Sequence, residues 1–410
     1  MGKIKYITRD LEKTIDKYID SKEIIAIVGV RQCGKTTLMK KVAKDLKSAG
    51  KKINFISFDD IGIMELFEED INSFIKLHIK SYDYLFIDEI QYARDSGRKL
   101  KFIFDTSDIK IFISGSSAAE IAIQSLKYLV GRIFTFILYP FSFREFLRSK
   151  DENLIGIYDD GKYGSVMVQR LNDYLKEFIL FGGFPRVVTT EHINEKKLIL
   201  KNIYNTYILR EIREIFQISS DYKLVKLMKA LSLQIGNIIN YQELNTLTET
   251  NFPELKKYLN ILQKSYIIQL VQPFFTNKRT ELVKSPKVYF IDHGFRNICI
   301  DTFSESLSQT GAMFEQFVLS EFIKSDMNVK YWRSKSGAEV DFVIEKEIPI
   351  PIEIKANLKS PKRSRSFHSF VEKYKPHCGY ILSLGLEDQI QKENTSIHFY
   401  PIVKTNLVNR

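Results

Sequence analysis

The stretch IIAIVGVRQCGKTTLMKK, residues 24–41, decides the fold because it joins an apolar run to a glycine-containing turn and then to a helical pattern. Residues 24–28 are mostly β-branched, which predicts a buried strand. After the turn, apolar side chains recur at helical spacing as Leu38, Val42 and Leu46. A strand, a turn and a helix in this order predict the start of a parallel α/β sheet.

The turn itself fits the pattern G-x-x-x-x-G-K-[ST] with Gly29, Gly34, Lys35 and Thr36. Glycines permit backbone conformations in which N–H groups point inward and cradle a phosphate. Lys35 would reach the β- and γ-phosphates, and the hydroxyl of Thr36 would bind Mg²⁺. The turn therefore predicts an ATP site formed by these residues and the adjacent Thr37.

Two further predicted strands end in residues that suit such a site. The strand in YDYLFIDEIQ ends in Asp88, which would hold Mg²⁺, and Glu89, which would polarise the attacking water. The alternative is an acidic strand end at the surface. In IKIFISGSSA, Ser114 or Ser116 would bind the γ-phosphate or the water. These serines equally suit capping of the next helix, and both interpretations stay open.

Composition narrows the class of protein. The chain has 410 residues, enough for two to four domains, and its 44% hydrophobic content allows ordinary cores. A net charge of +11 favours a polyanionic partner, with nucleic acid before membrane. The three distant cysteines form no disulfide or zinc pattern, which fits a cytoplasmic protein. The first twenty residues are too charged for a secretory signal, and no apolar run is long enough for a membrane helix, so we expect no membrane.

The sequence pattern in the middle of the chain predicts helices followed by a hairpin. Residues 171–218 have a helical pattern, and residues 223–275 predict three helices leading into a basic β-hairpin, which is the order of a winged helix. Basic residues on the third helix and the hairpin would contact DNA phosphates. These are Lys256, Lys257, Lys264, Lys278, Arg279, Lys284 and Lys287. The alternative is a packing module whose lysines are only solvated.

The C-terminal region combines carboxylates and a lysine on neighbouring predicted elements. Glu315 lies on an amphipathic helix, and Asp341 ends a run on a predicted strand. Alternating isoleucines on the next strand place Glu353 and Lys355 on one face. This arrangement is similar to the metal site of restriction-endonuclease-like domains, which implies that Asp341 and Glu353 share Mg²⁺ and that Lys355 orients or helps deprotonate a water. Glu315 would complete the metal shell or bind a second ion.

Basic and aromatic residues accompany this predicted metal site. The stretch KSPKRSRS, residues 359–366, would hold a phosphodiester backbone. Trp332 and Arg333, on a neighbouring strand, would either stack on a base or pack.

Several motifs together resemble one family. The phosphate loop, FIDEIQ, ISGSSA, LVGR, PFSFREF and FGGFPRVV are similar to prokaryotic AAA+ ATPases, specifically to a family in which such a core precedes a restriction-endonuclease-like domain. The C-terminal Glu, Asp and Glu-x-Lys pattern is similar to the metal site of that nuclease-like fold. The resemblance covers nearly the whole chain and is most specific in its first third.

The resemblance implies roles for two arginines. Arg132 of LVGR lies where AAA+ proteins carry an arginine finger that enters the ATP site of a neighbouring subunit, which implies a homo-oligomer. A surface or ion-paired arginine is the alternative. Arg186 of FGGFPRVV lies where relatives place the helical lid, and it is a candidate second sensor of the nucleotide.

The predicted fold class is α/β. It comprises an AAA+ P-loop ATPase core with a parallel sheet in residues 1–150, a helical lid in 151–220, a winged-helix-like region in 221–300 and an α/β restriction-endonuclease-like domain in 301–410.

The predicted function is that of an ATP-hydrolysing, Mg²⁺-dependent protein acting on DNA by remodelling, branch migration or repair-type processing. Its nuclease-like domain would bind DNA and either cleave it or not. The alternative is an ATP-dependent signalling or defence switch with a protein partner and a non-cleaving C-terminal domain. The sequence leaves open the DNA structure preferred, the number of subunits and the process served.

Overall fold

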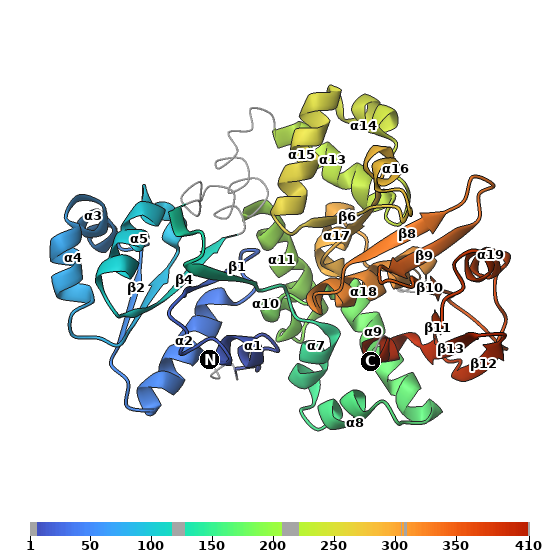
Figure 1. Ribbon diagram of the computed structural model, residues 1–410, viewed down its shortest axis with the longest axis horizontal. Coiled ribbons are helices and arrows are strands. Elements are labelled where there is room, and N and C mark those ends of the chain that lie inside the picture. Colours follow the sequence, from blue (N-terminus) through green and yellow to red (C-terminus); the bar gives the residue numbers. More distant parts are fainter. Residues whose placement is uncertain (1–5, 117–127, 207–220, 305, 307–309, 409–410) are drawn as a thin grey trace. The chain divides into compact units, whose positions relative to one another are not determined.

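The computed structural model describes residues 6–116, 128–206, 221–304, 306 and 310–408. These residues form two compact units. The first contains the described chain up to Pro140 together with Lys264–Tyr266, and the second contains Phe141–Tyr204 and nearly all of the chain from residue 221 onward (Figure 1). Among the described residues, the first unit has one sheet and the second has two.

The sheet of the first unit has five strands in the order β2-β3-β4-β1-β5. All of its pairings are parallel, and β1 lies between β4 and β5. Because parallel neighbours need a crossover, helices separate the strands from β1 to β4 along the chain. The predicted parallel α/β core is confirmed. Its strands are β1 (Ile24–Gly29), β2 (Ile53–Ser57), β3 (Tyr84–Asp88), β4 (Lys110–Ser116) and β5 (Ile133–Ile137).

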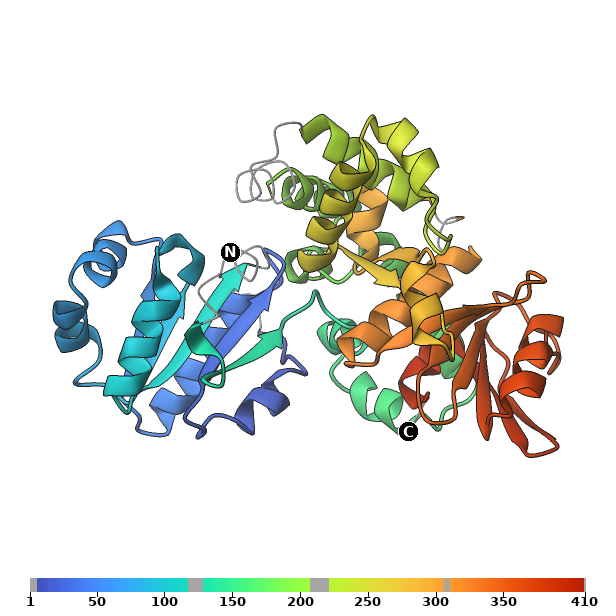
Figure 2. The same cartoon turned by 45° about the horizontal axis from the view of Figure 1, so that its top comes forward.

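Helices flank this sheet (Figure 2). Helix α2 (Lys35–Ser48) buries Leu38, Val42 and Leu46, the residues whose spacing predicted it. Helix α5 (Ser96–Thr106) contributes to a separate apolar cluster with alternate residues of β1, β3 and β4. The remaining helices of this unit are α1 (Glu12–Asp16), α3 (Ile61–Glu69), α4 (Ile71–His78) and the 3₁₀ turn η1 (Ile90–Tyr92).

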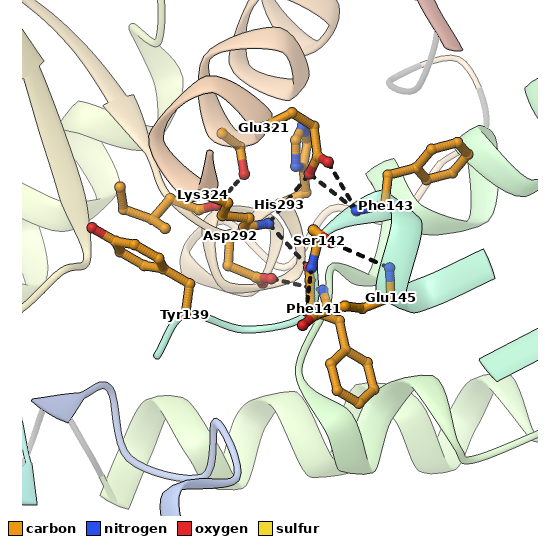
Figure 3. A network of polar contacts seen from close by, with 12 residues as sticks. Tyr139, Phe141, Ser142, Phe143, Glu145, Asp292, His293, Glu321 and Lys324 are labelled. Atoms are coloured by element: carbon orange, nitrogen blue, oxygen red, sulfur yellow. Dashed lines mark hydrogen bonds and ion pairs between the residues drawn. The ribbon is translucent and has the colours of Figure 1, made fainter. Parts of the chain in front are cut away.

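The second unit begins with helices joined by a buried polar network (Figure 3). The backbone N–H of Phe141 donates to the carbonyl of Gly183 (2.7 Å), and the N–H of Gly183 donates to Asp292 Oδ2 (2.7 Å). Lys324 Nζ donates to the carbonyl of Phe141 (3.0 Å). A Cβ at Gly183 would collide with that same carbonyl. The motifs PFSFREF and FGGFPRVV are thus held together through backbone groups inside this unit.

The described part of the stretch predicted to be helical, residues 171–218, is helical apart from short connections. Residues 207–220 of the predicted lid segment lie outside the described residues. The helices are α7 (Phe143–Lys150), α8 (Leu154–Asp160), α9 (Ser165–Phe181), α10 (Pro185–Val188), α11 (Ile193–Tyr204) and α17 (His293–Cys299).

The predicted order of three helices and a hairpin is confirmed. The helices are α13 (Asp221–Leu233), α14 (Tyr241–Thr248) and α15 (Phe252–Lys264). The antiparallel hairpin pairs β6 (Ile268–Val271) with β7 (Lys287–Phe290), and the short helix α16 (Lys278–Val283) lies in its connection. An isolated bridge between Ile238 and Lys287 adds a third extended segment beside β7.

A six-stranded mixed sheet ends the chain, in the order β12-β13-β11-β10-β9-β8. Helix α18 (Gly311–Lys324) precedes the sheet, and α19 (Arg365–Tyr374) connects β10 to its parallel neighbour β11. Strand β9 is antiparallel to both of its neighbours, β8 and β10. The strands are β8 (Val329–Arg333), β9 (Glu339–Ile344), β10 (Ile350–Ile354), β11 (Cys378–Ser383), β12 (Asp388–Lys392) and β13 (Thr395–Pro401), followed by η5 (Ile402–Leu407).

Candidate functional sites

The glycine turn of the first unit connects β1 directly to α2. A Cβ at Gly29 would collide with the backbone oxygen of Leu138, which follows β5. Gly34 has φ +102°, a left-handed conformation, and immediately precedes the helix. The two predicted glycines are therefore required for different reasons. Gly29 allows close packing against the backbone near Leu138, and Gly34 allows the left-handed turn before the helix.

The side chains that follow these glycines converge on the end of β3. Lys35 is buried, and its Nζ donates to the carbonyls of Gly29 and Val30 (both 3.1 Å). Thr36 Oγ1 donates to Asp88 Oδ2 (2.7 Å), which joins two motifs far apart in the sequence. Thr37 is exposed. This arrangement places an ammonium, a hydroxyl and a carboxylate around one turn of backbone.

Serines at the end of β4 complete this cluster. Ser114 Oγ donates to Asp88 Oδ1 and accepts from the N–H of Glu89 (3.3 Å). The hydroxyl of Ser116 is buried, and within the described residues it has no hydrogen-bond partner. Ser114 thus orients Asp88, and Ser116 is the serine here with an unused hydroxyl. The predicted contact with a γ-phosphate remains a prediction for both.

Glu89 has an unusual backbone and environment. Its φ of 57° and ψ of 47° are left-handed, which is uncommon for a residue with a side chain and often marks a functional position. Burial raises the pKa of its carboxyl, while the hydrogen bond from Gln91 and the charge of Lys35 oppose this shift. A carboxylate with a raised pKa is better suited to accept a proton near neutral pH.

The two arginines implied by the resemblance lie in different units. Arg132 pairs with Asp105, with 2.9 Å between Nε and Oδ1, so the ion-paired alternative describes this structure. Both side chains are partly exposed, and such pairs contribute little to stability. Arg186 is exposed on α10. The finger and sensor roles of these arginines stay predictions.

The four C-terminal residues selected from the sequence do come together. Lys355 Nζ lies 2.9 Å from Glu353 Oε1, and Asp341 Oδ2 accepts the backbone N–H of Ile354 (2.7 Å). Glu315 on α18 is close enough that its charge acts on both Asp341 and Lys355. We refer to Glu315, Glu339, Asp341, Glu353 and Lys355 as the carboxylate site.

Burial and mutual repulsion shape the protonation of this site. Burial, followed by the charge of Glu315, raises the pKa of Asp341 to about 7. Burial also raises the pKa of Glu315, although Lys287 opposes the shift. The pKa of Lys355 is raised, because the hydrogen bond and charge of Glu353 outweigh burial. A bound cation would lower the pKa of the carboxyl groups of both Asp341 and Glu315, because it would add an opposite charge.

Glu339 and the contacts that Tyr289 and Ser364 make with this site were not predicted from the sequence, and the prediction for Lys287 was wrong. Instead of reaching DNA from an exposed hairpin, Lys287 is buried, with Nζ 2.5 Å from Glu339 Oε1 and 3.9 Å from Glu315 Oε2. Tyr289 OH donates to Glu315 Oε2 (2.8 Å). Ser364 Oγ donates to Glu353 Oε2 (2.9 Å). Lys287 and Tyr289 are two positions apart on β7, and this strand alternation was the available signal.

The other basic residues have mixed environments. Lys257 and Lys264 are exposed, and Lys256 lies 4.8 Å from the Phe252 ring centroid. Lys278 pairs with Glu345. In the basic stretch, Lys359, Lys362 and Arg365 are exposed, and Arg363 has a buried nitrogen without a partner in the described chain. Trp332 packs edge-on against Phe370, so packing is its role here.

Carboxylate oxygens and excess negative charge suit Mg²⁺ at the carboxylate site. Among the described residues, the site has four carboxylates but only two buried or half-buried lysines. Lys287 pairs with Glu339 and approaches Glu315, and Lys355 pairs with Glu353. Arg333 approaches Glu339 (3.5 Å). In the part of the chain that is described, no three His, Cys, Asp or Glu side chains are already grouped to hold a metal ion. The ligand types fit a divalent cation, but a complete set of ligands is not formed.

Comparisons with known proteins agree with the division seen along the chain. A family model described as an AAA domain matches residues 21–147, and two models of domains of unknown function, DUF8612 and DUF4143, match residues 172–306 and 310–404. The first third is thus an AAA domain, and the parallel core with its phosphate loop has the AAA+ ATPase-like fold.

Two relatives match most of the chain. An uncharacterized protein of Methanocaldococcus jannaschii is 30% identical over 381 residues, covering 90% of this chain and 81% of the relative. A protein of Haemophilus influenzae is 25% identical, covering 80% and 81%. The chain belongs to the same family as the M. jannaschii protein.

Solved structures are more distant. A replication initiator DnaA bound to AMPPCP and single-stranded DNA has a TM-score of 0.31 at 14% identity, covering 63% of this chain and 90% of that one. The Aeropyrum pernix ORC1 protein in complex with DNA has a TM-score of 0.32 at 10% identity, covering 78% and 95%. Scores this low support no inference about function. Among the described residues, no helix has both the length and the apolar character needed to cross a membrane.

Proposed function

We propose that the protein binds and hydrolyses ATP with Mg²⁺ and uses this cycle to act on DNA as a homo-oligomer. The observation that carries the proposal is the hydrogen bond between Thr36 and Asp88, which brings the phosphate loop and the acidic end of β3 into one site. In such sites Mg²⁺ neutralises charge on the phosphates. Lys35 would release its backbone carbonyls to contact the β- and γ-phosphates.

Glu89 is the proposed base of this reaction. Its left-handed backbone and the hydrogen bond from Gln91 fix its carboxylate, and its raised pKa favours proton transfer from water. Ser116 offers a hydroxyl for the water or the γ-phosphate, whereas Ser114 holds Asp88. Arg132, once released from Asp105, would act in the site of a neighbouring subunit.

A second activity is supported by the carboxylate site. We propose that this restriction-endonuclease-like site hydrolyses phosphodiester bonds in DNA. Asp341 and Glu353 would hold Mg²⁺, which supplies Lewis-acid activation of the phosphate when bound. Lys355, anchored on Glu353, would orient the attacking water. The exposed cations at Lys359, Lys362 and Arg365 would bind the DNA backbone.

Nucleotide binding and turnover of the full chain test the first proposal. Lys35→Ala should abolish ATP binding, and DNA should accelerate ADP release by the wild type over many turnovers. Nucleotide that co-purifies with the protein and turns over slowly without a response to DNA would favour the signalling or defence switch instead.

A further inference from the structure

The carboxylate site contains residues from outside the C-terminal sheet. Lys287 and Tyr289 lie on β7, a strand of the hairpin that follows the three middle helices, and they contact Glu339 and Glu315. Gly236, in the turn after α13, has φ +77°, and a Cβ there would lie 3.1 Å from Glu315 Oε2. Two segments from outside the C-terminal sheet, β7 and the turn at Gly236, thus lie close to Glu315.

Lys287 is the buried cation of this arrangement. Its side chain is 3% exposed, compared with 44% for Lys355. It contacts Glu339 of β9 and approaches Glu315 of α18, whose charge acts on Asp341. Without it, Glu315, Glu339 and Asp341 would repel one another with little solvent to screen them.

The hairpin is also attached to the C-terminal sheet away from this cation. Lys330 on β8 pairs with Glu281 of α16 and with Glu345, which follows β9 (2.6 Å). Lys278 of α16 pairs with the same Glu345. The hairpin and the β8–β9 pair are therefore joined by two ion-paired clusters, and Lys287 lies in the one that contains the reactive carboxylates.

We propose that Lys287 is a positioning residue of the carboxylate site: it holds Glu315 and Glu339 in place, which leaves Asp341 and Glu353 free to receive a divalent cation. This rests on the proposed phosphodiester hydrolysis. It follows that the region matched by the last family model, residues 310–404, is not a complete site without the hairpin.

The test uses the full chain without nucleotide. Lys287→Met keeps the approximate length of the side chain and removes its charge, and Lys287→Arg keeps the charge. DNA cutting by Lys287→Met should fall on the order of 10–100-fold, as for other residues that orient metal ligands, and Lys287→Arg should recover most of it. Calorimetric Mn²⁺ binding to Lys287→Met should be as tight as wild type or tighter, because a repelling charge is gone. Asp341→Asn identifies the binding that belongs to this site.

Thermal unfolding separates positioning from general destabilisation. The unfolding midpoint of Lys287→Met should fall without divalent cations and recover in part with Mn²⁺. Lys404→Met is the matched control, because Lys404 is equally buried and paired with Glu387 (2.6 Å) elsewhere in the same unit. Its midpoint should also fall, and Mn²⁺ should raise it only as much as it raises the wild-type midpoint, because the carboxylate site of this variant is unchanged.

Three outcomes decide the proposal. Wild-type cutting by Lys287→Met would overturn it, and so would loss of Mn²⁺ binding together with an unfolding midpoint that Mn²⁺ does not restore. If the wild type cuts no DNA, the proposed nuclease activity is contradicted independently of the role of Lys287. The Mn²⁺ response of the midpoint still tests Lys287 in that case, and an equal response in Lys287→Met and Lys404→Met would contradict the positioning role.

Discussion

The nucleotide site and the carboxylate site are built in opposite ways. One short segment of the nucleotide site contains Gly29, Gly34, Lys35 and Thr36. Asp88 joins it from the end of β3, a parallel strand of the same sheet. The carboxylate site instead draws on α18, β7, β9, β10 and the cap of α19. A site made by one turn depends on local backbone geometry, whereas a site made by five elements depends on how those elements pack.

The strongest prediction for the local site concerns Arg132, which we propose acts in the site of a neighbouring subunit. Arg132→Ala should reduce ATP turnover by roughly 10³–10⁵-fold if this arginine stabilises charge on the transferring phosphoryl group. Mixing Arg132→Ala with Lys35→Ala protein should restore part of the activity, because some interfaces in a mixed oligomer are intact. The measurement is steady-state ADP release. A protein that stays monomeric by light scattering with ATP and DNA present would contradict action between subunits.

Glu89 should determine the rate of ATP hydrolysis and not the affinity for nucleotide. Glu89→Gln removes the proton acceptor but keeps the shape, so hydrolysis should fall about 10²–10⁴-fold while nucleotide affinity stays near wild type. Single-turnover kinetics and equilibrium binding measure the two quantities. Hydrolysis at the wild-type rate would remove Glu89 from this role. Lys35→Ala, which should lose binding itself, is the contrasting control.

The assembled site should respond to a residue that holds Glu353 without binding the metal itself. Ser364 donates to Glu353 and also accepts the N–H of Phe367 at the start of α19. Ser364→Ala should reduce cutting about 10–100-fold through Glu353 and cost about 1 kcal/mol of stability through the lost cap. Ser142→Ala removes a comparable cap from α7 and should affect stability alone. Equal cutting by both variants would contradict a role for Ser364 in the site.

The contrast between the sites explains what the sequence could predict. The phosphate loop and Asp88 were found because motif and strand pattern are local. Glu315, Asp341, Glu353 and Lys355 were found through a family pattern. Lys287 was misplaced on an exposed hairpin because a lysine's burial depends on which sheet its strand packs against, and hydrophobic periodicity does not encode that packing.

The smallest expected effect is on the pH dependence of stability. The pKa of Asp341 is raised from 3.8 to about 7, so the folded chain binds this proton more tightly than the unfolded chain. Its contribution to stability is therefore fully present below pH 4 and is lost as pH rises toward 7. Without divalent cations, the unfolding midpoint should drop over this range by a few degrees less in Asp341→Asn than in the wild type. Identical curves would show that Asp341 is not protonated in the folded site.

The most direct test of the central claim is one assay on the full chain. Single-stranded, duplex and branched DNA are incubated with Mg²⁺ or Mn²⁺, with and without ATP, and cut DNA and released ADP are counted in the same tubes. We predict DNA binding whose affinity falls with salt, DNA-stimulated ADP release, and cutting of at least one substrate that Asp341→Ala and Lys355→Ala lose while still binding DNA. Absence of DNA binding at low salt, with ADP release unchanged by any DNA, would contradict the account.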